Sequence, residues 1–504
     1  MKAGIQWVVV LTAGVCWTVT VSPLAGSSGQ SAPSPVVGEI PPAASAAPPP
    51  RRPNVVLITV DDMMASDLAF MPRTRRLLVR RGTTFTQGLA PTSICVPARA
   101  SQLSGQYAHN HGAVTVEGVG GGVKAFRDTN TLPVWLRRAG YDTLYLGKYL
   151  NGYGDTRRTA RYVPPGWSGW RATLGESTHW FHKTRFNLNG RVTTIDGYST
   201  DVLARFTTEM LDHQHDVAPR KPFFLSANYA APHQGGPRES DDPRVHWGPV
   251  DVYTTMPAPR HRNRFRGVDV PQVPEMWKRT RSAYSGPRVP RGFRAAVREM
   301  YQQRLESLLA VDQAVQRTVA TLRRNGDLAR TLIVFTSDNG FLTGHHNRVG
   351  KLVPWDSSSR VPMVVRGPGV PHAERASIPI THADVAVSIA AAAHARPGRT
   401  VDGLDVLGRV RSDPHARRII PISGYPVSGG TRPVFTGIRF GAWTYSRLRN
   451  GHEELYHRAT DPGELRNLAG RERYRDELAT FREWNRRYRR CAGNECPMEL
   501  DPSL

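Results

Sequence analysis

The chain has 504 residues, of which 39% are hydrophobic. It can therefore bury a large core and does not need disulfides or metal ions to form a stable core, as very small proteins do. Its formal net charge is +25, carried mostly by Arg residues in short scattered groups without interleaved aromatic residues. This distribution argues against a dedicated nucleic-acid-binding module and indicates an Arg-rich surface, so we expect no nucleic-acid partner.

The amino terminus has the features of a secretory signal peptide, which we assign to residues 1–25. Lys2 precedes an apolar run over 5–21, and small residues follow at 24–26. A retained membrane anchor is the alternative, and no later stretch is long and apolar enough to span a bilayer. Residues 26–52 are rich in Ser, Ala and Pro and are expected to form a disordered linker. We therefore expect a secreted or extracytoplasmic protein with no transmembrane span once the signal is removed.

Two β-branched runs end in oxygen-bearing side chains. The run over 53–60 leads into Asp61 and Asp62, and a second run over 331–337 leads into Asp338 and Asn339. Continuous apolar runs of this kind are typical of strands buried on both faces of a parallel sheet, whose carboxyl ends gather at one edge. A turn with helix-capping aspartates is the alternative. Four such side chains together would suit a hard divalent cation rather than a thiolate-preferring one.

Cys95 is an isolated cysteine, followed closely by Pro97 and Arg99. Cys491 and Cys496 lie close together near the carboxyl terminus, where an oxidising compartment would join them as a disulfide. The remaining cysteine would leave with the signal peptide, so Cys95 has no partner. It is either a small buried thiol in a turn or a reactive centre.

Two further strand-like runs end in a basic residue. The run over 141–146 leads into Lys148, and the run over 222–229 leads into His233. A lone residue of this kind is usually at the surface, but its recurrence beside the aspartates favours a shared site. Residues 293–324 show apolar spacing typical of a long helix packed on the sheet.

The remaining chain is expected to form a smaller unit. We expect strands over 434–439 and 442–447 and a helix over 474–489. These elements indicate a carboxyl-terminal subdomain at 400–504, after a larger domain at 53–399. We predict an α/β fold with a mostly parallel central sheet flanked by helices. The adjacent His345 and His346 are expected to form a solvated loop pair.

The chain resembles a type I, formylglycine-dependent sulfatase over nearly all of its folded part. The matching features are the Cys-x-Pro-x-Arg signature at 95–99 with Leu-Ser-Gly at 103–105, Asp61-Asp62, Gly147-Lys148, Pro232-His233, Ser-Asp-Asn-Gly at 337–340, Lys351 and Glu-Leu-Tyr at 454–456. The segments 147–151, 164–167 and 257–260 look most similar to the N-acetylglucosamine-6-sulfatase branch.

The resemblance implies an alkaline-phosphatase-like fold, with an antiparallel sheet in the smaller carboxyl-terminal α+β unit. It also implies that Cys95 is converted to 3-oxoalanine (formylglycine) by a formylglycine-generating enzyme during maturation. The implied metal ligands are Asp61, Asp62, Cys95, Asp338 and Asn339. Calcium is the usual ion of the family, and Mg²⁺ is the alternative.

Catalytic roles follow from the same resemblance. Arg99 and Lys148 would hold the hydrate oxygens and the sulfate, Lys351 would bind sulfate and assist the leaving oxygen, and His233 would give a proton to the departing alcohol. Many sulfatases carry a histidine two residues after the lysine as the base for sulfate release. This chain has Leu150 there. The base is therefore unassigned, with His111 as a candidate.

The implied function is a sulfuric ester hydrolase acting on a sulfate monoester. Candidate substrates are a sulfated sugar such as N-acetylglucosamine 6-sulfate, or an aryl sulfate. One alternative is a phosphomonoester or phosphodiester hydrolase of the same superfamily. The other is a non-catalytic, basic, polyanion-binding exported protein in which Cys95 stays a thiol. The segment 235–294, expected to set substrate choice, carries no chemistry that we can interpret.

Overall fold

The computed structural model describes residues 52–243, 246–247, 250–251, 253–290, 292–496 and 498–499. The predicted signal peptide and all but the last residue of the predicted linker lie outside these residues. The described residues all belong to one compact unit. Its division into a catalytic domain at 53–399 and a subdomain at 400–504 stays a prediction. Among the described helices, none combines the length and apolar character that crossing a membrane requires.

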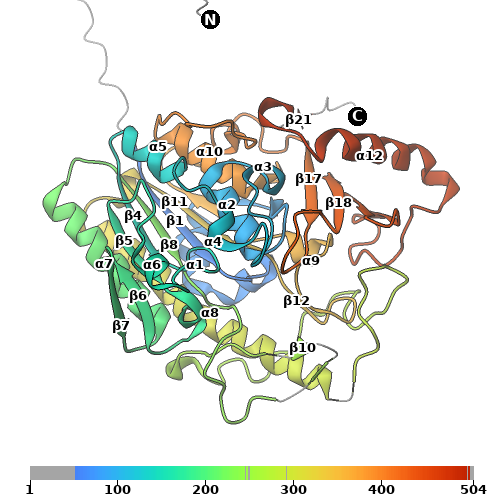
Figure 1. Ribbon diagram of the computed structural model, residues 1–504, viewed down its shortest axis with the longest axis horizontal. Coiled ribbons are helices and arrows are strands. Elements are labelled where there is room, and N and C mark those ends of the chain that lie inside the picture. Colours follow the sequence, from blue (N-terminus) through green and yellow to red (C-terminus); the bar gives the residue numbers. More distant parts are fainter. Residues whose placement is uncertain are drawn as a thin grey trace, which may run out of the picture. The chain divides into compact units, whose positions relative to one another are not determined.

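A ten-stranded sheet forms the centre of this unit (Figure 1). Its strand order is β15 (Glu374–Ala376), β2 (Thr83–Phe85), β14 (Met363–Arg366), β11 (Thr331–Ser337), β1 (Asn54–Val60), β8 (Phe223–Asn228), β4 (Asp142–Gly147), β5 (Gly169–Thr173), β6 (Thr184–Leu188) and β7 (Arg191–Ile195). The five neighbouring strands from β11 to β5 are mutually parallel, whereas β14 and β6 run antiparallel to them. The predicted α/β class with a mostly parallel central sheet is confirmed.

Helices cover both faces of the sheet. Alternate residues of β1 point to opposite sides, so Val56 packs in one core with α7 (Ser199–Val217) and α8 (Phe293–Arg324). Val55 packs in a second core with α5 (Leu132–Arg138) and α10 (His382–Ala392). Figure 1 shows this layered arrangement. The long helix predicted over 293–324 is confirmed at both ends.

A second, five-stranded antiparallel sheet lies toward the carboxyl terminus. Its order is β20 (Glu453–His457), β19 (Trp443–Leu448), β18 (Phe435–Phe440), β17 (Arg418–Gly424) and β21 (Met498–Glu499). The helix α12 (Arg475–Tyr488) packs its Phe481 against this sheet. Two of these strands and the helix lie within one residue of the predicted positions. Cys491 and Cys496 are joined by a disulfide, and Cys95 is free.

Short elements connect these layers. The α-helices are α1 (Pro72–Leu77), α2 (Cys95–Ser104), α3 (Ala108–His111), α4 (Gly122–Ala125), α6 (Arg157–Arg161), α9 (Asp356–Ser359) and α11 (Val406–Arg409). The 3-10 helices are η1 (Ala65–Phe70), η2 (Val79–Arg81), η3 (Gly175–His179), η4 (Pro259–His261), η5 (Leu328–Arg330), η6 (Glu472–Tyr474) and η7 (Gly493–Glu495). The remaining short strands are β3 (Gly88–Leu89), β9 (His246–Trp247), β10 (Val250–Asp251), β12 (Leu342–Thr343), β13 (Val349–Gly350) and β16 (Ile380–Thr381).

Candidate active site

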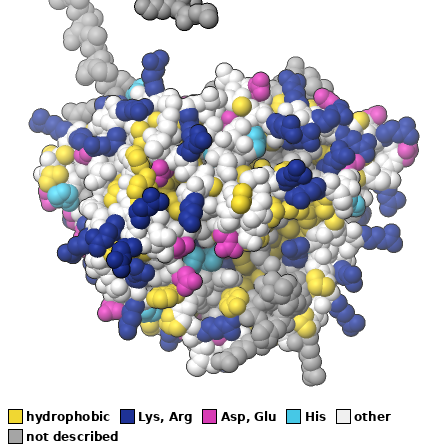
Figure 2. Space-filling model, in the orientation of Figure 1, with side chains coloured by type: hydrophobic (Ala, Val, Ile, Leu, Met, Phe, Trp, Pro, Cys, Tyr) yellow, Lys and Arg dark blue, Asp and Glu magenta, His cyan; other side chains and the backbone are white. Residues whose placement is uncertain are grey.

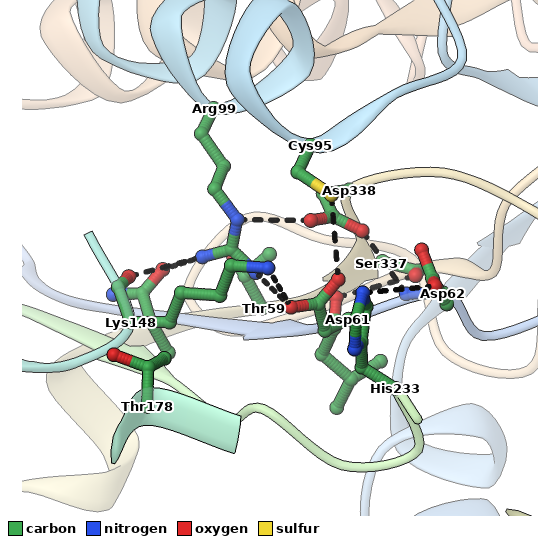
Figure 3. A network of polar contacts seen from close by, with 12 residues as sticks. Thr59, Asp61, Asp62, Cys95, Arg99, Lys148, Thr178, His233, Ser337 and Asp338 are labelled. Atoms are coloured by element: carbon green, nitrogen blue, oxygen red, sulfur yellow. Dashed lines mark hydrogen bonds and ion pairs between the residues drawn. The ribbon is translucent and has the colours of Figure 1, made fainter. Parts of the chain in front are cut away.

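The carboxyl ends of the parallel strands bring the predicted acidic residues to one edge of the sheet. Val60 of β1 is in register with Ser337 of β11, so the residues that follow the two strands emerge side by side. The backbone N–H of Asp62 donates to Asp338 Oδ1 at 3.1 Å. Figure 3 shows these carboxylates grouped below the start of α2.

The helix α2 supplies the cysteine and the arginine of the signature. Cys95 is its first residue, and Arg99 follows one turn later on the same side of the helix. The Cys95 thiol lies 3.8 Å from Asp61 Oδ1, and Lys351 Nζ donates to Cys95 Sγ at 3.0 Å. A helix amino terminus carries partial positive charge, which favours anionic groups at this position.

Lys148 reaches the site because Gly147, the last residue of β4, has a backbone conformation that residues with a side chain rarely adopt. Gly147 has φ of 90°, and a Cβ atom there would lie 1.8 Å from the backbone oxygen of Asn228 on β8. The close approach lets the backbone N–H of Lys148 donate to that same oxygen at 3.0 Å. The glycine that precedes the lysine is therefore required by geometry.

Buried cations face the buried carboxylates. Lys148 Nζ pairs with Asp61, Lys351 Nζ pairs with Asp62, and Arg99 Nε donates to Asp338 Oδ2 at 2.9 Å. Possible ligand atoms of Asp61, Asp62, Cys95 and His233 all lie within 4.8 Å of one another. The structure thus brings together all nine residues that the sequence singled out for the site.

Burial and charge act in opposite directions on the ionisable groups. Burial alone would raise the pKa of Asp62, but Lys351, His233 and Arg304 together hold this pKa far below its usual value. Burial raises the pKa of the Cys95 thiol, and the nearby lysines only partly offset this effect. The neutral thiol is therefore favoured over the thiolate, so an unmodified Cys95 would be a weak nucleophile.

The donor set fits a hard divalent cation. Asn339 Oδ1 is buried and accepts no hydrogen bond from any described residue, which is costly unless another group takes up its lone pairs. It is accompanied by the carboxylates of Asp61, Asp62 and Asp338. Oxygen ligands of this kind, with several carboxylates, are those that Ca²⁺ and Mg²⁺ prefer.

His233 is held with one ring nitrogen toward the site. Its Nδ1 lies 2.7 Å from the backbone oxygen of Gln234, so Nδ1 carries a proton and donates it. The opposite nitrogen, Nε2, lies 3.6 Å from Asp62 Oδ2. Burial lowers the pKa of His233 to about 3, against the opposing effect of Asp62. An anionic substrate bound nearby would raise this pKa again.

Sequence reasoning missed two residues at the site. Arg304 of α8 donates from Nη1 to the backbone oxygen of Pro232 at 3.1 Å, and its Nη2 contacts the backbone oxygen of Asp62. Arg304 lies at helical spacing from Leu308, on the buried face of the helix. An arginine among the apolar residues of that face was the one sequence feature that could have indicated its role. His179 stacks on His233 with ring centroids 4.3 Å apart, and no sequence pattern marked it.

The histidines that the sequence left open have structural contacts. His111 Nε2 lies 3.2 Å from both Ser101 Oγ and the backbone oxygen of Pro97, and its Nδ1 accepts from the backbone N–H of Ala113. Both nitrogens are occupied, so His111 is not available as a base.

The expectation of a solvated His345 and His346 pair is wrong. The two residues are 4% and 1% exposed, because His346 stacks on Trp355 and His345 Nδ1 accepts from the backbone N–H of Thr343.

Comparison with known proteins places these residues within one family. A family model described as Sulfatase matches residues 53–395. An arylsulfatase of Volvox carteri is 28% identical over 477 residues, covering 84% of this chain and 72% of that protein. The N-acetylglucosamine-6-sulfatase of Homo sapiens is 31% identical over 376 residues, covering 71% and 64%. An extracellular sulfatase SULF-1 homolog of Drosophila melanogaster is 32% identical over 340 residues, covering 63% and 28%. The chain thus spans less than two thirds of the length of the human and the Drosophila relative.

Solved structures with the same fold have low sequence identity. One, determined in complex with its substrate D-glucosamine-2-N,6-O-disulfate, gives a TM-score of 0.69 at 19% identity and covers 86% of this chain and 97% of that one. A phosphonate monoester hydrolase of Agrobacterium radiobacter gives a TM-score of 0.61 at 19% identity, covering 90% and 100%. At this identity the similarity shows the fold alone.

Proposed function

The chain belongs to the sulfatase family, and on this premise we propose that it hydrolyses a sulfate monoester of a sugar at the edge of the central sheet. The observation that carries the proposal is the buried cluster that groups Cys95 with three carboxylates and three cations, in which Cys95 itself contacts Asp61 and Lys351. A sulfate ester carries delocalised negative charge, and fixed cations in a dry site stabilise charge of this kind during reaction. The aldehyde made from Cys95 would supply, as its hydrate, the nucleophilic oxygen.

We assign the cation to Asp61, Asp62, Asp338 and Asn339, with the modified Cys95 completing the shell. When bound, the cation lowers the pKa of a coordinated hydroxyl and offsets charge on the sulfate oxygens. Calcium is our preferred ion because the ligands are all oxygen atoms and its coordination number is flexible, whereas Mg²⁺ demands a near-octahedral arrangement.

The two lysines and the arginine have different roles at the site. Lys148 and Lys351 place their ammonium groups beside Asp61, Asp62 and Cys95, where they can bind sulfate oxygens. Arg99 Nη1 donates to the backbone oxygen of Lys148 at 3.1 Å, and Arg99 Nε fixes Asp338. We infer that Arg99 positions the other groups. Its direct contact with a hydrate oxygen, implied by the family resemblance, stays a prediction.

His233 is our proton donor to the leaving oxygen. With Nδ1 held by Gln234, only Nε2 is free to reach a substrate, and its proton must arrive with or after the anion that raises its pKa. Leu150 offers no base: it is 3% exposed and packs in a cluster with Tyr149 and Trp170.

We also propose a location and a domain organisation for the chain. The names of two relatives include the word extracellular, which supports our proposal of a secreted or extracytoplasmic enzyme. We propose 53–399 as the catalytic domain and 400–504 as its subdomain, and a formylglycine-generating enzyme as a maturation partner.

The similarity to phosphonate monoester hydrolases supports one competing function, phosphoryl ester hydrolysis. Turnover of matched aryl sulfate and aryl phosphate esters separates the two. We expect kcat/KM for the aryl sulfate to exceed that for the phosphate. A preference for the phosphate would contradict the sulfatase proposal, and turnover of neither would favour the non-catalytic, polyanion-binding alternative.

Removal of the cation should inactivate and destabilise the protein. Without it, the clustered carboxylates lose a neutralising charge, and Asn339 Oδ1 keeps no partner among the described residues. We expect treatment with a chelator followed by dialysis to abolish sulfate release and lower the melting temperature, and Ca²⁺ to restore both. A chelated sample with unchanged activity and melting temperature would argue against a metal at these residues.

A further inference from the structure

A buried arginine, Arg304, lies among the segments that carry the candidate site. Figure 2 shows Lys and Arg side chains spread over the face of the molecule that it draws, whereas Arg304 is 1% exposed. Among the described residues four arginines are buried, and three of them, Arg99, Arg418 and Arg439, pair with a carboxylate. Arg304 forms no ion pair with any described residue. A buried charge of this kind is costly unless hydrogen bonds compensate it.

The guanidinium group of Arg304 donates to two backbone oxygens of the site. Nη2 donates to the oxygen of Asp62, a proposed metal ligand, and Nη1 donates at 3.1 Å to the oxygen of Pro232, the residue before His233. Its carbon Cζ also lies 4.1 Å from the centre of the Phe341 ring. One side chain thus contacts the three segments that follow β1, β8 and β11.

The helix α8 gives this side chain a fixed base. Leu305 and Leu308, close to Arg304 along the helix, are fully buried in two of the hydrophobic cores to which α8 contributes. A close-packed core resists displacement, and a guanidinium group is planar with its N–H donors in fixed directions. Arg304 can therefore hold two oxygens at a set separation. A lysine cannot do so, because its single ammonium nitrogen ends a flexible chain.

The backbone of Asp62 is held by side chains from two other segments. Its φ of 68° lies in the left-handed region, which residues with a side chain seldom adopt. The N–H of Asp62 donates to Asp338 Oδ1, and its oxygen accepts from Arg304. Both polar groups of this residue's backbone are thus bonded, which stabilises the uncommon conformation that brings its carboxylate to the site.

The segment before His233 is also held at successive residues. The N–H of Asp61 donates to the oxygen of Ala231 at 3.3 Å, and Arg304 donates to the oxygen of the next residue, Pro232. A proline has no N–H, so this oxygen is the only backbone group through which Pro232 can form a hydrogen bond. Arg304 therefore holds the residue directly before the proposed proton donor.

We propose that Arg304 is a positioning residue, which sets where His233 lies relative to Asp62 by holding the backbone of both segments. The proposal rests on the proposed sulfatase function and deepens it, because Arg304 would act on the proton donor without touching the substrate. His233 Nε2 lies 3.6 Å from Asp62 Oδ2, and Figure 3 shows the ring directed toward the carboxylates. A proton donor must lie within hydrogen-bond reach of the leaving oxygen, and a misplacement of about 1 Å can cost about 10²-fold in rate.

The variant Arg304→Lys should harm a substrate that needs a proton on its leaving oxygen more than one that does not. At saturating Ca²⁺ we expect kcat/KM for a sugar sulfate to fall at least about tenfold further than kcat/KM for para-nitrophenyl sulfate. An effect through Asp62 on the metal site acts on both esters alike and cancels in this comparison. An equal loss with both esters, or no loss with either, would overturn the proposal.

The exposed Arg298 of α8 supplies a matched control. Arg298→Lys makes the same chemical change on the same helix and should leave kcat/KM unchanged for both esters. A preferential loss with the sugar sulfate in this control would show that the effect does not depend on the contacts of Arg304. Arg304→Gln, whose amide can reach at most one of the two oxygens, is measured alongside and should show the same preferential loss, so that misfolding of one variant does not decide the result.

A double-mutant cycle with His233→Ala separates positioning of the proton donor from a general structural role. In the His233→Ala protein, Arg304→Lys should change the ratio of the two kcat/KM values by less than about threefold, because no proton donor remains to be placed. A larger change of this ratio in the absence of His233 would refute the proposal.

The crystal structure of Arg304→Lys gives a readout that does not depend on turnover. We expect the separation of His233 Nε2 and Asp62 Oδ2 to increase by at least about 1 Å. An unchanged separation would contradict the proposal even if the original protein hydrolysed no sulfate ester. An increased separation, together with no turnover by the original protein, would refute the proposed function and leave the positioning role of Arg304 supported.

Discussion

Replacement of Cys95 by Ala is expected to abolish sulfate release while the protein stays folded. The aldehyde hydrate has no substitute in the site, so we expect kcat/KM to fall by at least about 10⁴-fold for any sulfate ester. The side chain is small, and among the described residues its polar contacts are those with Asp61 Oδ1 and Lys351 Nζ. Its loss should therefore cost no more than about 1–2 kcal/mol of unfolding free energy. Sulfate release and chemical denaturation measure the two effects.

A second variant, Cys95→Ser, tests whether the second hydrate oxygen is needed to release sulfate. It restores a hydroxyl group, which can accept sulfate, but it lacks the second hydrate oxygen that expels sulfate again. We expect at most one turnover per molecule, seen as a burst followed by a stop. Sustained turnover by either variant would show that Cys95 is not the precursor of the nucleophile.

Replacement of His233 by Ala is expected to reduce hydrolysis in proportion to the need for a proton on the leaving oxygen. A sugar alcohol is a poor leaving group, and loss of a general acid typically costs about 10²–10⁴-fold in rate. A para-nitrophenolate leaves without a proton, so para-nitrophenyl sulfate should be affected far less. The measurement is kcat/KM for both substrates with both proteins.

The control for His233→Ala is His372→Ala, which removes an exposed histidine. We expect this control to keep the kinetics of the original protein with both esters. An equal loss with the sugar sulfate and the aryl sulfate in His233→Ala would mean that His233 holds the sulfate or the metal site rather than donating a proton.

The edge of the central sheet was predictable from the sequence because local residue patterns identify the buried strands and therefore the residues that follow them. Buried strands were read from continuous β-branched runs over 53–60 and 331–337, and parallel pairing places the residues that follow them at one edge. The same rule placed Lys148 near the aspartates. The helix over 293–324 was predictable from its apolar spacing. In each case a local residue pattern predicts whether one face or both faces of the element are buried.

The rest of the site depends on contacts between segments that no local pattern connects. His179 stacks on His233 across 54 residues of sequence, from a short 3-10 helix with no strong propensity. Arg304 could have been noticed only as a charge on the buried face of α8. The burial of His346 depends on Trp355 lying over its ring. The expectation that 235–294 sets substrate choice stays a prediction.

The proposed mechanism depends most on the chemical state of residue 95, and the mass of the peptide that contains this residue tests it directly. The peptide is taken from protein made in its native host, or together with a formylglycine-generating enzyme. We predict that residue 95 has lost sulfur and two hydrogens and gained one oxygen relative to cysteine. An active preparation in which residue 95 is entirely an unmodified cysteine would contradict the proposed mechanism.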